Sequence, residues 1–145
     1  MSHQRERFVR PQDVETQVFD WGYLKWLSEP RVTAAEKFSA GVVILKPGAG
    51  HTAHRHPGCE EILYVISGTG EQMVADERRS IAAGDLIHIP PDVEHETINT
   101  AWEELKLLAV YAPPGPEVEL RAMPECTILR PGELPTRQAP REHDT

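Results

Sequence analysis

The sequence predicts an all-β protein, a sandwich or barrel of short strands, and three observations favour this fold class. Short apolar or alternating runs follow one another between residues 38 and 112. Turn-forming pairs such as Pro57-Gly58 and Pro90-Pro91 separate these runs, as in folds built from many short strands. Thirteen prolines and ten glycines among 145 residues leave little room for long helices.

The predicted strands begin with an aromatic N-terminal segment. Residues 18–27 carry two tryptophans and could form one strand or a pair, packed on the barrel or on a neighbouring subunit. A short stretch at residues 32–38 could form one helical turn, which is too short to change the fold class. The six strands that follow are predicted at Phe38–Leu45, Glu60–Ser67, Gly70–Ala75, Asp85–Pro90, His95–Asn99 and Glu104–Ala112.

The chain length and the distribution of proline predict a single domain with two tails. We expect residues 1–12 to form an N-terminal tail and residues 13–114 to form the barrel with its N-terminal strands. After Pro113 the sequence becomes polar and is interrupted by prolines. Residues 115–145 are therefore predicted to be an extended C-terminal arm followed by a weakly ordered tail.

Charge and cysteine content exclude several classes of partner. A net charge of −8 argues against nucleic acid or an anionic membrane surface, since both require a basic face. No run approaches the roughly 20 apolar residues of a membrane span, and residues 1–11 lack the apolar core of a signal peptide. Cys59 and Cys126 form no ligand-type pair, so we expect a cytoplasmic protein with two reduced thiols, a disulfide being the alternative.

One short segment, GHTAHRHPGCEEILYVISG at residues 50–68, concentrates histidines and carboxylates. Such a segment suits a metal site, an acid–base pair or a polar loop. Residues two apart in a strand share a face, so His54 and His56 project to the same side. Glu61 lies at the start of the next strand and shares a face with the leucine and the valine that follow it at positions 63 and 65. His95 begins a later strand and supplies a third imidazole. Convergence of these four side chains favours a site for zinc or another first-row metal ion.

Two motifs in the sequence resemble those of the cupins. The first motif has the order glycine, H-x-H, glutamate, glycine, and the second has the order glycine, proline, histidine, asparagine. The matching residues are Gly48, His54, His56, Glu61 and Gly68 in the first motif, and Gly84, Pro90, His95 and Asn99 in the second. The second motif departs from the family pattern at Asp92, where a glycine is usual. Aspartate tolerates left-handed backbone geometry, so the turn stays plausible.

The resemblance, which covers roughly residues 38–112, implies the fold and the metal centre of a small single-domain cupin. That fold is a double-stranded β-helix, or jelly-roll barrel, and it implies one divalent metal ion per chain held by His54, His56, Glu61 and His95. We favour iron or manganese in the cell. Zinc, nickel, cobalt or copper are alternatives, because affinity rises toward the later metals.

The remaining polar residues near the motifs have weaker predictions. Strand alternation turns Glu60 outward and His51 away from His54. His88 is interpreted as a structural histidine, with a place in the pocket as the alternative, and Cys59 is expected to be an inert thiol. Two further histidines lie in the tails and are expected to have no role, namely His3 and His143.

Two functions follow from an open metal site in an apolar barrel. The first is a small-molecule metalloenzyme, either a dioxygenase or an isomerase or lyase acting through a metal-bound enolate. The second is a non-catalytic protein that binds or senses a small ligand, because this fold hosts both kinds. No catalytic residue beyond the ligands is identified, and Tyr64 and Tyr111 are expected to pack. We also expect a homodimer, in which Val18–Leu27 and Cys126–Leu129 extend a neighbour's sheet.

Overall fold

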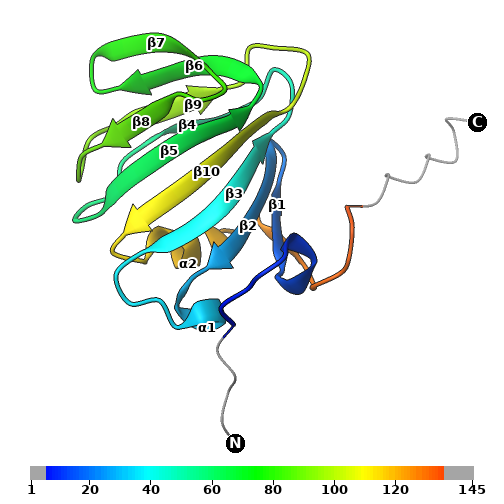
Figure 1. Cartoon of the computed structure of the whole chain (residues 1–145). Helices are drawn as coiled ribbons and strands as arrows, with labels where there is room; N and C mark the ends of the chain where they lie inside the picture. Colours follow the sequence, from blue (N-terminus) through cyan, green and yellow to red (C-terminus); the bar gives the residue numbers. More distant parts are fainter. Residues whose placement is uncertain (1–5, 136–145) are drawn as a thin grey trace, which may run out of the picture.

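The computed structural model of the chain describes residues 6–135 and consists mainly of short strands (Figure 1). The strands are β1 (Thr16–Phe19), β2 (Gly22–Ser28), β3 (Ser39–Leu45), β4 (Gly50–His54), β5 (Glu60–Ser67), β6 (Thr69–Val74), β7 (Glu77–Ala82), β8 (Leu86–Ile89), β9 (His95–Ile98), β10 (Leu105–Ala112) and β11 (Thr127–Leu129). Two short helices are α1 (Pro30–Thr33) and α2 (Pro116–Arg121), and Pro11–Asp13 forms a single 3-10 turn.

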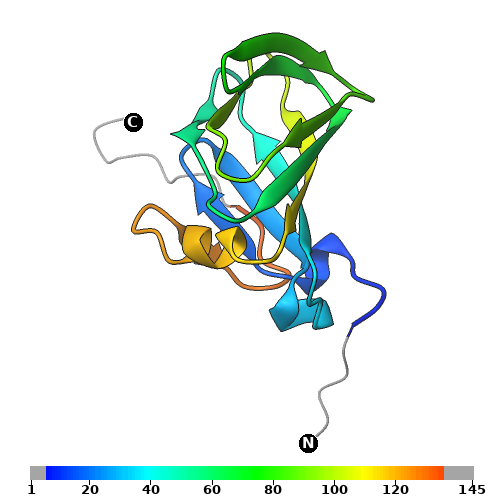
Figure 2. The same cartoon turned by 90° about the vertical axis from the view of Figure 1, so that its left-hand side faces the viewer.

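These strands form two antiparallel sheets that face each other, as expected for a jelly-roll barrel. The larger sheet has the strand order β11-β1-β2-β3-β10-β5-β8, and the smaller has the order β4-β9-β6-β7. Figure 2 shows the two sheets enclosing a common interior, with α2 beside one end. The all-β prediction is confirmed, and each of the six strands predicted between residues 38 and 112 is present with ends shifted by at most one residue.

Strand alternation places the core between the sheets. On β5 the buried side chains are Glu61, Leu63 and Val65, whereas Ile62 and Tyr64 lie on the outer face. The inward-facing residues of β10 are likewise buried. Because these two strands are neighbours in the larger sheet, they give the barrel an aliphatic interior into which Glu61 brings a carboxylate.

Strand β7 was not among the predicted strands. Its sequence, ERRSIA, is strongly charged, and Ile81 is its one buried side chain. The strand lies at the edge of the smaller sheet and pairs with β6 alone. An edge strand with both faces largely exposed does not require the alternation that identifies half-buried strands.

The aromatic N-terminal segment forms strands that pair with other strands of the same chain. Strand β2 pairs with β3, and β1 pairs with both β2 and β11. Leu24 and Trp26 of β2 are each 3% exposed and belong to the core. We expected this segment to add to a neighbour's sheet, but in the structure its partner strands come from the same chain. Homodimerisation itself stays a prediction.

Part of the segment expected to be an extended arm is folded onto the barrel. Within it, α2 buries Glu117 and Leu120, and β11 completes the edge of the larger sheet. The Glu117 carboxylate accepts hydrogen bonds from Ser39 Oγ at 2.8 Å and from the Gly115 backbone at 2.9 Å. Residues 136–145 of the arm, with His143, and residues 1–5, with His3, lie outside the described residues.

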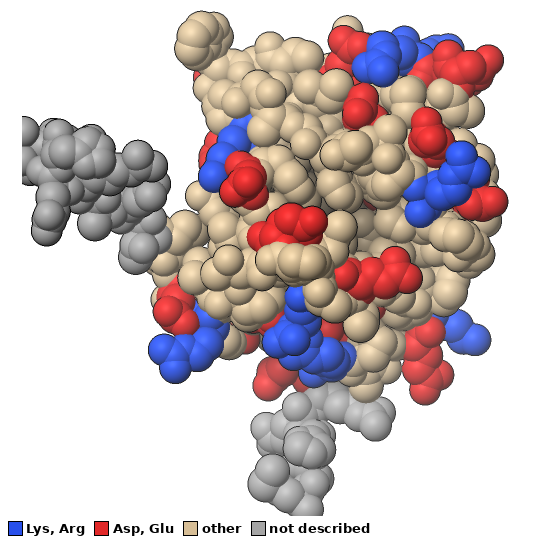
Figure 3. Space-filling view, turned by 180° about the vertical axis from the view of Figure 1, so that it is seen from behind, with Lys and Arg blue, Asp and Glu red and all other residues tan. Residues whose placement is uncertain are grey.

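The helices and one face of the molecule bear on the predictions about membranes and nucleic acids. Within residues 6–135, no helix has the length and apolar character needed to cross a bilayer. On the face drawn in Figure 3, lysine and arginine side chains lie among aspartate and glutamate side chains. This face therefore lacks the concentration of positive charge that nucleic acids require.

Candidate metal centre

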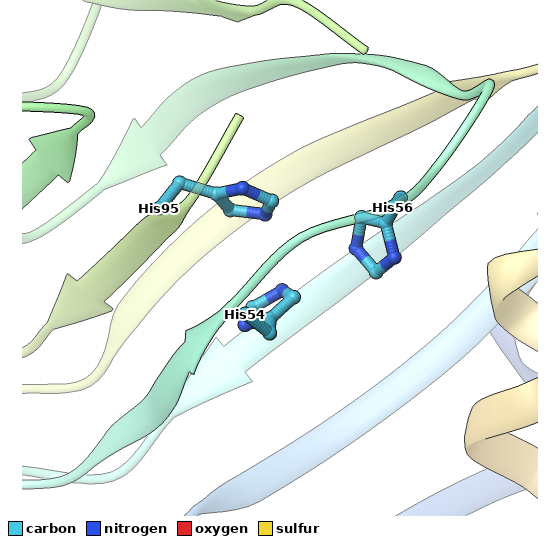
Figure 4. Close-up of side chains that lie close together, drawn as sticks. All are labelled: His54, His56 and His95. Carbon is cyan, nitrogen blue, oxygen red and sulfur yellow. The ribbon is translucent and has the colours of Figure 1, made fainter. Parts of the chain in front are cut away.

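Three histidines from two neighbouring segments converge between the sheets. Strand β4 ends at His54, the loop after it carries His56, and His95 begins β9. Because β4 and β9 pair with His54 opposite His95, the two imidazoles start from adjacent backbone positions. One ring nitrogen from each of the three residues lies within 4.8 Å of the other two, and Figure 4 shows the rings turned toward one another.

Backbone hydrogen bonds hold the loop that carries His56 against the loop that precedes His95. The carbonyl oxygen of His56 accepts from the N–H of Cys59 at 3.2 Å and from that of Asp92 at 3.1 Å. Asp92 has φ of 60°, the left-handed geometry that the usual glycine would supply and that aspartate tolerates. The departure from the cupin motif thus leaves the turn intact.

Glu61 lies beside this histidine cluster. Its Oε1 atom is 3.1 Å from His95 Nε2 and 3.6 Å from His56 Nε2. The side chains of Glu61 and His95 are only 5% and 3% exposed. The structure therefore brings together all four residues that the sequence singled out.

The hydrogen bonds of the histidines direct their free nitrogens toward the centre. His54 Nδ1 lies 2.7 Å from the Thr52 carbonyl, and His95 Nδ1 lies 2.9 Å from the Val93 carbonyl. A carbonyl oxygen only accepts, so each Nδ1–H donates and the Nε2 atom of the neutral ring keeps its lone pair.

Several of these inward-facing atoms are buried without a hydrogen-bond partner in the described chain, namely His56 Nε2, Glu61 Oε1 and His95 Nε2. Buried polar atoms are normally paired, because leaving one unsatisfied costs about 1–3 kcal/mol. A divalent metal ion would satisfy three such atoms at once. The donor set of imidazole and carboxylate groups therefore fits a divalent metal ion.

Burial favours the neutral forms of His54, His56 and Glu61. Burial, with the neighbouring His54 and His95, lowers the pKa of His56 to about 4. Burial also lowers the pKa of His54 and raises that of Glu61. Burial acts to lower the pKa of His95 as well, but its contact with Glu61 outweighs that effect and the pKa is raised.

A fourth histidine, His51, joins the site, and the expectation that it faces away from His54 is wrong. Its ring centroid lies 4.2 Å from that of His54 and 4.9 Å from that of Trp21. The pairing of β4 with β9 shifts register between His51 and His54, so simple alternation does not hold along this strand. Burial lowers the pKa of His51 to about 3, with the other histidines adding to the effect.

Three of the four proposed ligands, His54, Glu61 and His95, border a small cavity of about 40 Å³ together with His51. Its walls are mostly aliphatic side chains of β2, β3, β5 and β10, among them Leu24, Val43 and Leu107. Tyr111 also lines it, 5.2 Å between ring centroids from His56, so this tyrosine borders the pocket as well as packing in the core. Burial raises the pKa of Tyr111 well above its usual value, so the phenol stays protonated.

Other residues considered from the sequence lie outside the cluster. His88 is on the outer face, where its Nε2 atom is 2.5 Å from the Glu60 carboxylate. Cys59 donates to the Pro113 carbonyl at 3.4 Å, and burial raises its thiol pKa to about 11, as expected for an inert thiol. Asn99 is fully buried and its amide nitrogen donates to the carbonyl groups of Leu45 and Glu103, so it fixes backbone.

Comparisons with known proteins agree with this geometry. A family model described as "Cupin domain" matches residues 41–111. Protein SchB from Streptomyces halstedii is 31% identical over 120 residues, which cover 83% of this chain and 87% of SchB. Polyketide synthase CurC from Streptomyces cyaneus is 29% identical over 120 residues, which cover 83% of this chain and 78% of CurC.

A solved structure shows the same fold at lower sequence identity. An RmlC-like cupin from Shewanella frigidimarina NCIMB 400 superimposes with a TM-score of 0.68 and 19% identity. The match covers 78% of this chain and 96% of that protein.

Proposed function

This chain belongs to the cupin family, as a small single-domain member, and on that premise we propose that it is a metal-dependent enzyme acting on a small molecule. The ion would be one divalent metal per chain, bound by His54, His56, Glu61 and His95. The observation that supports this proposal is the group of buried, unpartnered nitrogen and oxygen atoms aimed at one point.

The donor set favours a first-row transition metal. Three imidazoles of borderline hardness and one hard carboxylate form a mixed set, which suits iron and manganese as well as zinc, cobalt, nickel and copper. We propose iron or manganese as the metal in the cell. Purified protein would carry a later metal where one is in excess, because affinity rises along the series from manganese to copper.

The proposed substrate carries a carbonyl or enol oxygen. A divalent ion in this site would polarise that oxygen and lower the pKa of an attached or adjacent proton. The chain itself contributes apolar walls that exclude water, and Tyr111, whose raised pKa keeps it a hydrogen-bond donor at neutral pH. The relative named polyketide synthase adds support, because polyketide chains are rich in carbonyl groups. The reaction classes that fit are oxygenation of an enol and isomerisation or cleavage beside a carbonyl.

The alternative function is a non-catalytic protein that binds or senses a small ligand. The same pocket of about 40 Å³ would hold that ligand, because this fold hosts both enzymes and binding proteins. Turnover separates the two functions: product formation and oxygen consumption would be followed with acyclic β-diketones and short keto acids. Conversion of any of them that depends on the metal supports the enzyme, whereas metal-dependent binding without conversion supports the sensor.

Elemental analysis of purified variants tests the metal site. We expect about one divalent ion per chain in the wild-type protein and almost none in a variant with both His54→Ala and His56→Ala. The matched control is His88→Ala, which removes a histidine from the outer face and should keep the full metal content. A double variant that still holds one ion per chain would overturn the ligand assignment.

A further inference from the structure

A continuous stack of aromatic rings reaches from the N-terminal strands into the metal pocket. Phe19 and Trp21 stack with centroids 4.7 Å apart and planes at 11°. Trp21 stacks in turn on His51 at 4.9 Å and 26°. His51 then contacts the proposed ligand His54 at 4.2 Å.

The position of Trp21 in this stack is fixed on several sides. It lies in the tight turn between β1 and β2, and its carbonyl oxygen accepts a hydrogen bond from the Lys46 backbone at 2.9 Å. One face of its indole is covered by Phe19, which is 4% exposed, and the other by His51. Both faces are therefore occupied, so the indole is a wall of the pocket and offers no free surface for a ligand to stack on.

The cavity that this wall borders is very small. The space beside the histidines is about 40 Å³, and Trp21 and His51 are part of its lining. One water molecule needs about 10–15 Å³, whereas a cavity that holds benzene measures about 150 Å³. The pocket with its stack in place thus has room for about three or four water-sized groups, which is less space than a six-membered ring needs.

We propose that Trp21 is the residue that sets the size limit of the ligand, by holding His51 in the stack that forms one wall of the pocket. The inference rests on the proposed function in placing the ligand beside the metal. A compact carboxylate or carbonyl compound enters with the stack intact. A ring-bearing substrate enters only when the stack opens or when the indole is shortened.

An ordinary packing role for Trp21 makes a different prediction. Truncating a packing residue lowers stability and leaves the relative affinity for small and large ligands unchanged. Truncating a size-limiting residue changes that relative affinity. The ratio of two ligand affinities therefore separates the two roles, and it is insensitive to a general loss of stability.

The test uses protein loaded with Co²⁺, whose visible spectrum reports on its ligands, and two carboxylate probes, acetate and benzoate. We expect wild-type protein to bind acetate at least tenfold more tightly than benzoate. In Trp21→Ala, benzoate affinity should rise at least tenfold while acetate affinity stays within twofold. Trp21→Phe, which keeps a smaller ring, should fall between the two. The matched control is Trp102→Ala, because Trp102 is 96% exposed. This control variant should bind both probes as the wild-type protein does.

The outcomes distinguish this inference from the metal assignment. A folded, cobalt-loaded Trp21→Ala variant that binds benzoate no better than wild type would overturn the size limit. Wild-type protein that takes up no Co²⁺ would instead contradict the proposed function. In that case metal-free protein still tests the inference, because benzene should raise the thermal midpoint of Trp21→Ala more than that of the wild type. An equal effect of benzene on both proteins would overturn it.

Discussion

Two consecutive glutamates of β5 each face a histidine, and the two contacts differ in almost every physical respect. Glu60 lies on the outer face, where its carboxylate is 2.5 Å from His88 and both side chains are 51% exposed. Glu61 lies on the inner face, 3.1 Å from His95, with the two side chains 5% and 3% exposed. The residue types are the same, and strand alternation alone separates them.

The difference shows why residue type does not by itself identify a metal site. Glu60 and His88 satisfy each other and are hydrated, and such exposed pairs contribute about 0–1 kcal/mol. The facing atoms of Glu61 and His95 are buried and, within residues 6–135, make no hydrogen bond of good geometry. Two further imidazoles lie beside them. The inner pair therefore has an unmet requirement for a cation, which the outer pair lacks.

The largest expected effect comes from exchanging each glutamate for glutamine. Glu61→Gln removes the negative charge from the proposed ligand set and should lower the affinity for Mn²⁺ by at least about a hundredfold. That is the largest loss usually caused by mutating a residue that only hydrogen-bonds to a metal ligand, and Glu61 is itself a proposed ligand. Glu60→Gln should change that affinity by less than twofold. Isothermal titration calorimetry of both variants measures the difference, and equal affinities would contradict the distinction between the two faces.

Lowering the pH should release the metal through the Glu61–His95 pair. The pKa of His95 is raised by Glu61, so protons begin to compete for this ligand above the usual histidine pKa of about 6.5. The pKa values of His54 and His56 are lowered, so these ligands protonate later. Metal affinity should therefore fall steadily from pH 8 to pH 5, whereas the circular dichroism of the strands persists. Loss of both signals together would mean that the ion holds the fold.

The stability of the metal-free protein should also depend on pH, with a definite sign. His56 has a pKa of about 4 in the folded chain and about 6.5 when unfolded, so between these values the unfolded chain binds more protons. The free energy of unfolding should therefore fall as pH drops from about 6.5 to 4. His56→Leu cannot be protonated and should reduce this slope, the remainder coming from His51 and His54, whose pKa values burial also lowers. His88→Leu should retain the full slope. Urea unfolding at several pH values measures the slopes, and identical slopes would contradict the burial argument.

The smallest effect is expected from breaking the outer pair. Glu60→Gln or His88→Ala should lower the free energy of unfolding by less than about 1 kcal/mol, because both groups are hydrated when they separate. Denaturant unfolding at pH 7 measures it. A loss of several kcal/mol would show that the outer contact supports the fold and would remove the contrast with the inner one.

Strand alternation and motif spacing were sufficient to predict much of the fold and the four convergent residues. Alternation along β5 selects Glu61 over Glu60, and the structure agrees. The same rule failed for His51, because a register shift between β4 and β9 changes the face of the strand, and a single sequence carries no signal for that shift.

Two elements escaped prediction for other reasons. Half of the residues of strand β7 are charged, and α2 begins at Pro116 in a proline-rich stretch. Helix α2 is held by the buried contacts of Glu117 with Ser39 and Gln17. These contacts join residues that are far apart in the chain, so local patterns do not reveal them.

Anomalous diffraction from crystals of the manganese-loaded protein tests the central claim most directly. The account predicts one strong anomalous peak per chain, at about 2.0–2.3 Å from a ring nitrogen of His54, His56 and His95 and from a Glu61 carboxylate oxygen. A peak between Glu60 and His88, or no peak within bonding distance of the three inner histidines, would contradict it.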